Sequence, residues 1–202
     1  MSTPAWDQDS VRAKLRTATV GIAGLGGLGS NLAVALVRSG IGRLILADFD
    51  RVEPGNLNRQ QYTRRDIGAF KTDALAAYLR QIDPDVDLLT HTLTLTPENI
   101  PAVFGDADIL AECLDWASTK AMFVRTCLAT LVARGKKLVA VSGLAGCGSA
   151  NEIVTHVMGP RFAMIGDLQT DVRGTPVLLA SRVGIAALHE ANHIIRWILE
   201  EA

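Results

Sequence analysis

Cysteine is scarce in this sequence, and the net charge is close to zero. The 202 residues include three cysteines, and none of them belongs to a CxxC pair. A disulfide scaffold and a four-cysteine zinc site are therefore excluded, and we expect a reducing, cytoplasmic location without structural zinc. Lys and Arg number 20 and Asp and Glu number 21, so the formal charge is −1. This balance leaves no electrostatic footprint for DNA.

The sequence also has little that suggests a membrane span. Residues 17–37 carry no charge, and this stretch has the length of a transmembrane helix, about 20 residues. Five glycines are clustered toward its start, and glycine disfavours a helix. The residues before it contain no apolar stretch of the signal-peptide type. We expect a soluble protein without a membrane partner.

Buried strands alternate with amphipathic helices along most of the chain. Hydrophobic residues make up 49% and charged residues 20%, which is typical of a globular protein rather than a disordered one. The alternation predicts a parallel sheet, and two strand-like runs around Gly159-Pro160 predict a hairpin. We expect one α/β domain over residues 1–202, with a Rossmann-like doubly wound sheet that is parallel in the N-terminal part and has antiparallel strands at the C-terminal end. The expected strands are 19–24, 43–48, 86–95, 107–113, 136–143, 151–158 and 161–165, and the expected helices are 5–18, 30–40, 71–82, 118–135 and 177–200.

A glycine-rich turn follows the first predicted strand. Its pattern is Gly24-x-Gly26-Gly27-x-Gly29, directly before a helix. Without side chains, the backbone N–H groups of such a turn can approach a phosphate or a ribose, and the start of the helix favours an anion. Asp48 ends the second strand, 19 residues after Gly29, where a carboxylate can bind ribose hydroxyls. We interpret the pattern as a nucleotide site, although tight packing of the helix on the strand would also select glycine.

A loop of unusual length, residues 49–70, follows Asp48, and loops of this length are often functional. Its segment NLNRQQ contains Asn56, Asn58, Arg59 and Gln60. These side chains are planar donors at the nucleotide end of the sheet, and a guanidinium binds polyphosphate through paired hydrogen bonds. The loop is therefore a candidate phosphate-binding segment.

Lys71 begins the helix predicted over residues 71–82. A cation is unfavourable at the start of a helix because of the helix dipole. An anionic ligand would compensate for it, so Lys71 is a second candidate for binding phosphate. The alternative is that Lys71 and Arg59 are solvated surface charges, as most Lys and Arg side chains are.

Asp115 follows the fourth predicted strand. The carboxyl ends of the strands in an open α/β sheet face the ligand crevice, and one or two carboxylates there can hold Mg²⁺ together with water and phosphate. The alternative role is an N-cap for the helix over 118–134. Ser118 and Thr119 could supply that cap, so we prefer the metal role for Asp115.

These motifs together resemble a known family. GLGGLG, DFD, NLNRQ, G-x-x-K from Gly68 to Lys71 and D-x-x-x-x-K from Asp115 to Lys120 are similar to motifs of the ubiquitin-activating-type adenylyltransferases. Within these, the chain resembles the ThiF/MoeB/HesA group, and most of all the short ThiF form, which is about as long as this chain, lacks zinc-binding cysteines and is linked to thiamine biosynthesis.

The resemblance implies ATP-dependent adenylylation of the C-terminal glycine of a small ubiquitin-fold sulfur carrier. The Gly-Gly carboxylate of the carrier would attack ATP·Mg²⁺ and give an acyl adenylate and pyrophosphate, and a sulfur donor protein would then form a thiocarboxylate. Members of the family are commonly homodimers. The implied catalytic residues are Arg59, Lys71 and Asp115, with Asp115 as the Mg²⁺ ligand, and the implied nucleotide-binding residues are Gly24, Gly26, Gly27, Gly29, Asp48, Asn56, Asn58, Arg59, Gln60 and Lys71.

Elementary electrostatics agrees with this reaction. A carboxylate that attacks a polyphosphate brings two anions together, so catalysis consists of neutralising and aligning them. Two cations and a metal ion beside one crevice meet that demand. An ionised carboxylate needs no general base.

The sequence departs from the family pattern at several positions. Trp116 stands where relatives usually have Asn after the metal-binding Asp. The N-terminal arginine that many relatives extend into a partner subunit is not recognisable, and Arg12 or Arg16 could substitute for it. Cys147 is the candidate for relaying sulfur. It has no Lys, Arg or His within five residues to lower the pKa of its thiol, so we expect a structural or incidental role.

Other functions remain possible from the sequence. An NAD-dependent oxidoreductase would explain the glycine turn and Asp48, but it would leave NLNRQ, Lys71 and Asp115 without a role. A non-enzymatic nucleotide-binding protein would not need Arg59, Lys71 and Asp115. Within the family, the acceptor could be another carrier, such as a molybdopterin carrier, or a tRNA-bound carboxylate. The net charge of −1 counts mildly against tRNA.

Overall fold

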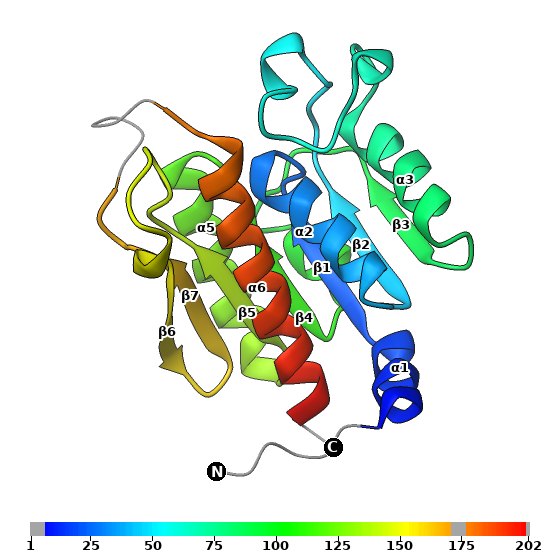
Figure 1. Ribbon diagram of the computed structural model, residues 1–202. Helices are drawn as coiled ribbons and strands as arrows, with labels where there is room; N and C mark the ends of the chain where they lie inside the picture. The colour runs from blue at the N-terminus through cyan, green and yellow to red at the C-terminus, as the bar shows by residue number, and fades with distance from the viewer. Residues whose placement is uncertain (1–6, 171–176, 201–202) are drawn as a thin grey trace.

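The protein is a seven-stranded sheet with helices on both faces (Figure 1). The computed structural model describes residues 7–170 and 177–200. Along the sheet the strand order is β3-β2-β1-β4-β5-β7-β6. The strands are β1 Thr19–Ala23, β2 Arg43–Ala47, β3 Asp87–His91, β4 Ile109–Glu112, β5 Lys137–Val141, β6 Val154–Gly159 and β7 Phe162–Gly166. The helices are α1 Gln8–Thr17, α2 Gly27–Arg38, α3 Lys71–Ile82, α4 Ile100–Val103, α5 Ala117–Thr130 and α6 Ala180–Glu200.

Two apolar layers hold the helices on the sheet. Successive strand residues point to opposite faces, so Leu44 and Leu46 face one layer, whereas Ile45 faces the other. The first layer is formed with α1, α2, α3 and α6, and the second with α4 and α5. In the second layer the rings of Phe104 and Phe123 meet edge to face, 5.7 Å apart. This is the doubly wound arrangement that the alternating pattern predicts.

The C-terminal end of the sheet confirms the expected hairpin and refines it. Strand β6 runs antiparallel to β7, and β7 itself runs parallel to β5. The sheet is therefore parallel from β3 to β7, and β6 is an antiparallel edge strand. All strands except β6 end at one edge of the sheet, which we call the carboxyl edge.

Several element boundaries differ from the predictions. The strand expected over 86–95 is shorter, Asp87–His91, and the helix expected over 118–135 runs from Ala117 to Thr130. The last helix begins at Ala180 rather than at 177, because Leu178 is bridged to Gly146 in extended form. The helix expected from residue 5 begins at Gln8, and residues 5 and 6 lie outside the described part. The long loop contains two short 3-10 turns, Pro54–Asn56 and Arg64–Asp66, and α4 was not expected.

The uncharged stretch over residues 17–37 does not form one helix. It is divided between β1 and α2, with the glycine turn between them. Within residues 7–170 and 177–200, no helix combines the length and the apolar composition that a membrane span requires.

Candidate nucleotide site

The glycine turn joins β1 to α2 at the carboxyl edge, and packing explains two of its glycines. Gly24 has a φ of +90°, and a Cβ added there would lie 2.7 Å from the carbonyl oxygen of Cys113. A Cβ on Gly29 would lie 1.9 Å from the carbonyl oxygen of Gly24. No side chain fits at either position. The packing alternative is therefore correct for Gly24 and Gly29.

The other two glycines lie at the start of α2. Gly26 is the N-cap of the helix, and no side chain caps the first turn. A Cβ on Gly26 would meet only the side-chain nitrogen of Gln60, at 3.7 Å, while one on Gly27 would approach Val183 and the aliphatic part of Arg59. The first N–H groups of a helix lack partners within the helix. The start of α2 is thus available to an anion, beside Arg59 and Gln60.

Asp48, directly after β2, fixes the turn from the side. Its two carboxylate oxygens accept the backbone N–H of Leu25 at 2.6 Å and of Asp50 at 2.7 Å. Burial raises the pKa of Asp48, while the charge of Lys71 and the two N–H donors lower it. Each oxygen retains a second lone pair. The position is that expected for a ribose-binding carboxylate.

Lys71 has a partner that the sequence analysis did not single out. Its buried ammonium lies 2.7 Å from Asp50 Oδ2, and its backbone N–H donates to the Asp50 carbonyl. Asp50 compensates for a cation at the start of α3, so the position of Lys71 does not by itself indicate an anionic ligand, and its phosphate role stays a prediction. The last residue of the DFD motif is Asp50, so this motif was the feature of the sequence that could have indicated a partner for Lys71.

The NLNRQQ segment is fastened to the glycine turn by neutral hydrogen bonds. Ser30 Oγ donates to the Gly26 carbonyl at 2.6 Å and accepts the backbone N–H of Gln61 at 3.1 Å. The amide of Asn31 donates to the carbonyls of Gly27 and Arg59, at 2.6 and 3.0 Å. These bonds come from the first turn of α2, so the helix that begins the site also positions the loop.

Tyr62 adds a further attachment of the same loop. Its hydroxyl donates to the Leu25 carbonyl at 2.8 Å, and burial raises the pKa of that hydroxyl far above its ordinary value. Sequence analysis missed Ser30, Asn31 and Tyr62. Their signal was weak, because Ser, Asn and Tyr beside a glycine turn have many ordinary roles.

The four predicted loop side chains have different surroundings. Asn56 Oδ1 accepts the Glu53 N–H, so Asn56 shapes a 3-10 turn, and Asn58 Oδ1 accepts from Arg59 Nη1 at 2.8 Å. Within the described residues, Arg59 has no carboxylate partner, and the side-chain oxygen of buried Gln60 has no hydrogen-bond partner. Arg59 and Gln60 are therefore the loop side chains with unused capacity for a ligand.

Asp115 is exposed at the carboxyl edge, after β4. One of its oxygens accepts the N–H of Trp116, and Trp116 is the N-cap of α5 without a side-chain cap. The N-cap alternative for Asp115 was wrong, and neither Ser118 nor Thr119 caps the helix. Among the residues that the structure describes, no three His, Cys, Asp or Glu side chains form a metal-binding group.

A buried ion pair holds the segment that carries Asp115. Lys120 Nζ lies 2.9 Å from Oε2 of Glu112, and it donates to the Leu114 carbonyl at 2.8 Å. Glu112 Oε1 accepts the Leu114 N–H. Burial raises the pKa of Glu112, and Lys120 lowers it. The sequence motif included Lys120, but Glu112 was missed because it lies within an apolar strand.

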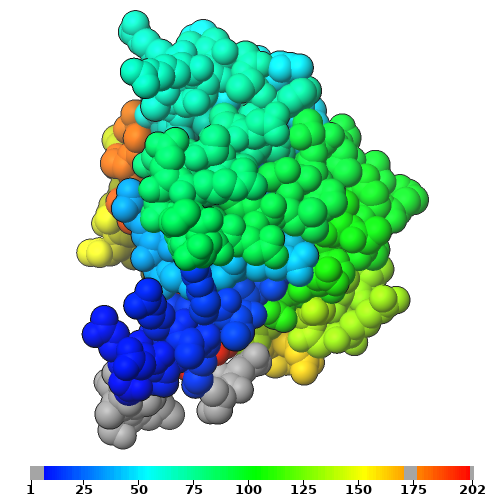
Figure 2. All heavy atoms as spheres, turned by 90° about the vertical axis from the view of Figure 1, so that its right-hand side faces the viewer, coloured from blue at the N-terminus to red at the C-terminus, as the bar shows by residue number. Residues whose placement is uncertain are grey.

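Arg16, a candidate for an arginine extended to a partner subunit, lies on α1 and is paired with Asp83, at the edge opposite the glycine turn. Figure 2 shows α1 in dark blue at the bottom and the long loop in cyan at the top. Cys147, the candidate for relaying sulfur, is exposed, whereas Cys113 and Cys127 are buried.

Comparison with known proteins decides the family. The ThiF family matches residues 1–202, the whole of the sequence. The chain belongs to the ThiF family. It is 39% identical over 132 residues to the adenylyltransferase and sulfurtransferase uba4 of Aspergillus fumigatus (strain CBS 144.89), covering 65% of this chain and 26% of that protein. It is 39% identical over 150 residues to the adenylyltransferase and sulfurtransferase MOCS3 of Xenopus laevis, covering 74% and 32%.

Solved structures share the fold of this ThiF-family chain. The E. coli tRNA N6-threonylcarbamoyladenosine dehydratase TcdA, in complex with AMP, matches with a TM-score of 0.84 at 20% identity and covers 95% of this chain and 90% of that chain. E. coli MccB with ATP matches with a TM-score of 0.72 at 24% identity and covers 95% and 58%. These likenesses confirm the Rossmann-like fold. The matched segments make up only about a quarter to a third of the two curated relatives.

Proposed function

We propose that this ThiF-family chain adenylylates the C-terminal glycine carboxylate of a small ubiquitin-fold sulfur carrier of the thiamine-biosynthesis type. The observation that carries the proposal is the convergence of Asp48, Gln60, Lys71 and an uncapped helix start at one edge of the sheet. Two relatives of the chain are named adenylyltransferases. The proposed unit is a single ATP-binding domain over residues 1–202, acting in the cytoplasm.

ATP fits the groups at the glycine turn. The free lone pairs of Asp48 would accept the ribose hydroxyls, and the N–H groups at the start of α2 would bind phosphate. The side-chain oxygen of Gln60 has no partner within the described residues. It is an acceptor, so a hydroxyl or amino group of the nucleotide, and not a phosphate, would satisfy it. Solved structures of the fold contain ATP or AMP, which favours ATP over NAD for this chain.

The cations of the site would make the reaction possible. Arg59 Nη1 is bonded only to neutral oxygens, those of Gly55 and Asn58, so its charge remains available for the phosphates. Lys71 is buried and shares its charge with Asp50. Together they would reduce the repulsion between the acceptor carboxylate and the triphosphate, and the acceptor oxygen would attack the α-phosphorus as pyrophosphate leaves.

Asp115 fits a magnesium ion that arrives with the nucleotide. Its exposed carboxylate accepts one hydrogen bond, from its neighbour Trp116, and Mg²⁺ often takes one protein carboxylate together with water and phosphate oxygens. The ion would supply further neutralisation of the triphosphate. Asp115 would hold it, on a segment that the pair of Glu112 and Lys120 keeps in place.

The further partners follow from the same proposal. A sulfur donor protein would convert the adenylate to a thiocarboxylate, and the chain would act as a homodimer. A tRNA-bound carboxylate is the second candidate acceptor, because TcdA is named for a tRNA modification. At 20% identity that likeness concerns the fold alone, and the charge of −1 does not favour a nucleic acid.

Carrier-dependent exchange of pyrophosphate into ATP tests the proposal. We expect exchange with a thiamine-type carrier that ends in Gly-Gly, and none with the same carrier lacking the final glycine. ATP with Mg²⁺ should raise the melting temperature more than NAD⁺ or NADP⁺ at equal concentration, because a ligand stabilises the state to which it binds. Tight binding of NAD⁺ without binding of ATP, measured by calorimetry, would overturn the proposal.

A further inference from the structure

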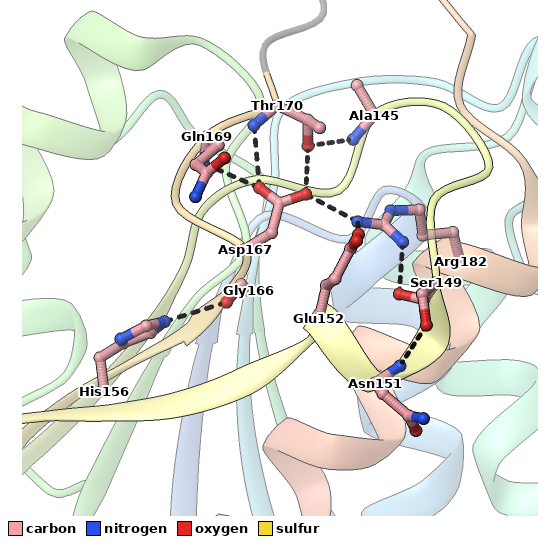
Figure 3. Close-up of polar contacts among 10 residues, drawn as sticks. All are labelled: Ala145, Ser149, Asn151, Glu152, His156, Gly166, Asp167, Gln169, Thr170 and Arg182. Atoms are coloured by element: carbon pink, nitrogen blue, oxygen red, sulfur yellow. Dashed lines mark hydrogen bonds and ion pairs between the residues drawn. The ribbon is translucent and has the colours of Figure 1, made fainter.

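Arg182, in the first turn of α6, is a buried arginine that joins three segments of the chain. It is 2% exposed. Nη1 donates to the Ser149 carbonyl at 3.0 Å, and Nη2 donates to Asp167 Oδ2 at 2.6 Å. Figure 3 shows that these partners come from the loop after β5 and the loop after β7. Glu152 lies 3.6 Å from the same Nη2.

Asp167 is the centre of this network. Its oxygens accept the N–H groups of Gln169 and Thr170 and the hydroxyl of Thr170, each at 2.8 Å. Thr170 Oγ1 also accepts the N–H of Ala145 at 3.1 Å. Burial raises the pKa of Asp167, but the donors, including Arg182, outweigh it and lower the pKa to about 2. The carboxylate is therefore charged at neutral pH, and Thr170 and Arg182 link it to the loop after β5 (Figure 3).

Gly143 lets the loop after β5 approach Asp167 closely. It has a φ of +80°, and a Cβ there would lie 2.0 Å from Asp167 Oδ1. A Cβ on Gly148 would lie 2.7 Å from Glu152 Oε2, but Glu152 is an exposed, flexible side chain, so this contact does not by itself require glycine. Gly143 thus allows the backbone to close around the Asp167 carboxylate.

The network also lies beside the nucleotide turn. Val183 follows Arg182 on α6, and its side chain lies 3.0 Å from where a Cβ on Gly27, at the start of α2, would be. A buried ion pair contributes little net stability, because desolvation offsets the attraction. Burying Arg182 and Asp167 costs desolvation free energy. We explain this cost by the fixed position that the pair gives to the loops at the carboxyl edge.

We propose that Arg182 and Asp167 are positioning residues for the acceptor, a role that rests on the proposed function. They hold residues 142–153, after β5, and residues 167–170, after β7, as the wall along which the acceptor tail lies. Arg59 and Lys71 occupy the β2 side of the glycine turn, where pyrophosphate leaves. Because attacking and leaving oxygens lie roughly in line, the acceptor carboxylate arrives from the β5 and β7 side.

Both Nη atoms of Arg182 and the Asp167 carboxylate are engaged within their own network, so the proposal separates two measurements. Arg182→Gln should lower kcat/KM for a thiamine-type carrier ending in Gly-Gly by about 100-fold, the scale of a misplaced reacting group. The Kd for ATP, measured by calorimetry without carrier, should stay within about twofold of the wild-type value. Asp167→Asn, which keeps the shape, should behave in the same way.

Two further variants distinguish positioning from a general structural role. Arg182→Lys keeps the charge toward Asp167 and should recover part of the lost kcat/KM. Arg196→Gln is the matched control, because Arg196 lies on the same helix in an exposed ion pair with Glu200, and it should change neither measurement. If Arg182→Gln does not fold, Thr170→Val removes the bonds to Asp167 and Ala145 and should raise the KM for the carrier about tenfold.

The outcomes are distinct. A lowered kcat/KM for the carrier with unchanged ATP binding, partly rescued by Lys, supports the proposal. A wild-type kcat/KM in the folded variants overturns it and leaves the proposed function intact, as does an equal loss of carrier and ATP binding, which indicates a structural role. A wild-type protein without carrier-dependent exchange overturns both, because the proposed position presupposes the acceptor.

Discussion

Two groups of loops at the same edge of the sheet are held in different ways. The long loop after β2 is fastened by neutral hydrogen bonds from Ser30, Asn31 and Tyr62 to backbone groups. The loops after β5 and β7 are fastened by the buried ion pair of Arg182 and Asp167. The first group of bonds leaves the Arg59 guanidinium without a carboxylate partner within the described residues. The guanidinium of Arg182, by contrast, is paired with the Asp167 carboxylate.

This difference indicates which arginine serves which purpose. A cation paired with a buried carboxylate, as Arg182 is with Asp167, has little attraction left for an added anion, because both charges are satisfied at short range. Lys71 differs, because the side chain of its partner Asp50 is 45% exposed and its charge is screened by water. Arg59 has neutral partners and lies partly exposed beside the start of α2. We therefore expect Arg59 to act on the nucleotide and Arg182 to act on the shape of the site.

The largest expected effect tests the nucleotide side. Arg59→Ala should lower carrier-dependent pyrophosphate exchange by about 100- to 1,000-fold, the usual loss when a group that stabilises developing charge is removed. The melting temperature should change little, because its guanidinium bonds only within the exposed loop. Arg64→Ala, an exposed position of the same loop, is the control. Exchange that survives in Arg59→Ala would remove the distinction between the two arginines.

Asp115 stands between the two groups of loops and should show the next largest effect. Asp115→Ala should lower exchange by about 100-fold at low Mg²⁺, because the remaining metal ligands would be phosphate and water. Exchange is to be measured across a series of Mg²⁺ concentrations, with Asp106→Ala as an exposed control. Full exchange of the variant at low Mg²⁺ would withdraw the metal assignment of Asp115.

The places in the fold of the nucleotide-side candidates could be predicted from the sequence for a simple reason, although their roles stay predictions. Parallel strands end at the same edge, so Asp48, Lys71 and Asp115 could be placed together once the strands were recognised. The pairing of Asp50 with Lys71 and of Glu112 with Lys120 could not be placed in this way, because a carboxylate near a strand end has many possible partners. Helix α5 begins at Ala117, one residue earlier than expected. Its N-cap is Trp116, which provides no capping side chain, so no capping residue marked this boundary in the sequence.

The β5 and β7 side could not be predicted from local patterns. Arg182 and Asp167 lie on opposite sides of a polar stretch that resembled an ordinary loop, part of which, residues 171–176, lies outside the described residues. Their contact depends on the docking of α6 against α2, which no short motif encodes. The role of Gly143, which leaves room for the Asp167 carboxylate, likewise depends on a contact between two distant loops.

Cys113 and Glu190 form a further buried pair, and we expect this pair to affect the stability of the fold. The thiol of Cys113 donates to Oε2 of buried Glu190, whose other oxygen has no partner within the described residues. Burial raises the pKa of Glu190 well above 4.5, with a further increase from Glu112. In the unfolded chain the Glu190 carboxyl ionises near pH 4.5. Above that pH, folding must keep the carboxyl protonated, and this costs free energy. The free energy of unfolding therefore falls as the pH rises above 4.5.

Glu190→Gln removes this cost and keeps the shape. The variant should match the wild-type melting temperature below pH 4.5 and exceed it by a few degrees near pH 8, about the shift that 1 kcal/mol produces. Melting curves across this range test the sign, and Glu200→Gln, exposed on the same helix, should show no such difference. A variant less stable than the wild type at pH 8 would mean that the Glu190 carboxylate is charged and stabilising.

The smallest expected effect concerns Cys147, on the loop that Arg182 fastens. Cys147 is exposed, and the five residues on either side of it contain no Lys, Arg or His, the residue types that activate a thiol. Adenylate formation requires no thiol, so Cys147→Ser should leave pyrophosphate exchange within about twofold of the wild-type rate. The same variant is to be tested for thiocarboxylate formation with a sulfur donor. Loss of thiocarboxylate with intact exchange would identify Cys147 as a sulfur relay, whereas loss of both would show that the β5 loop depends on this side chain for its shape.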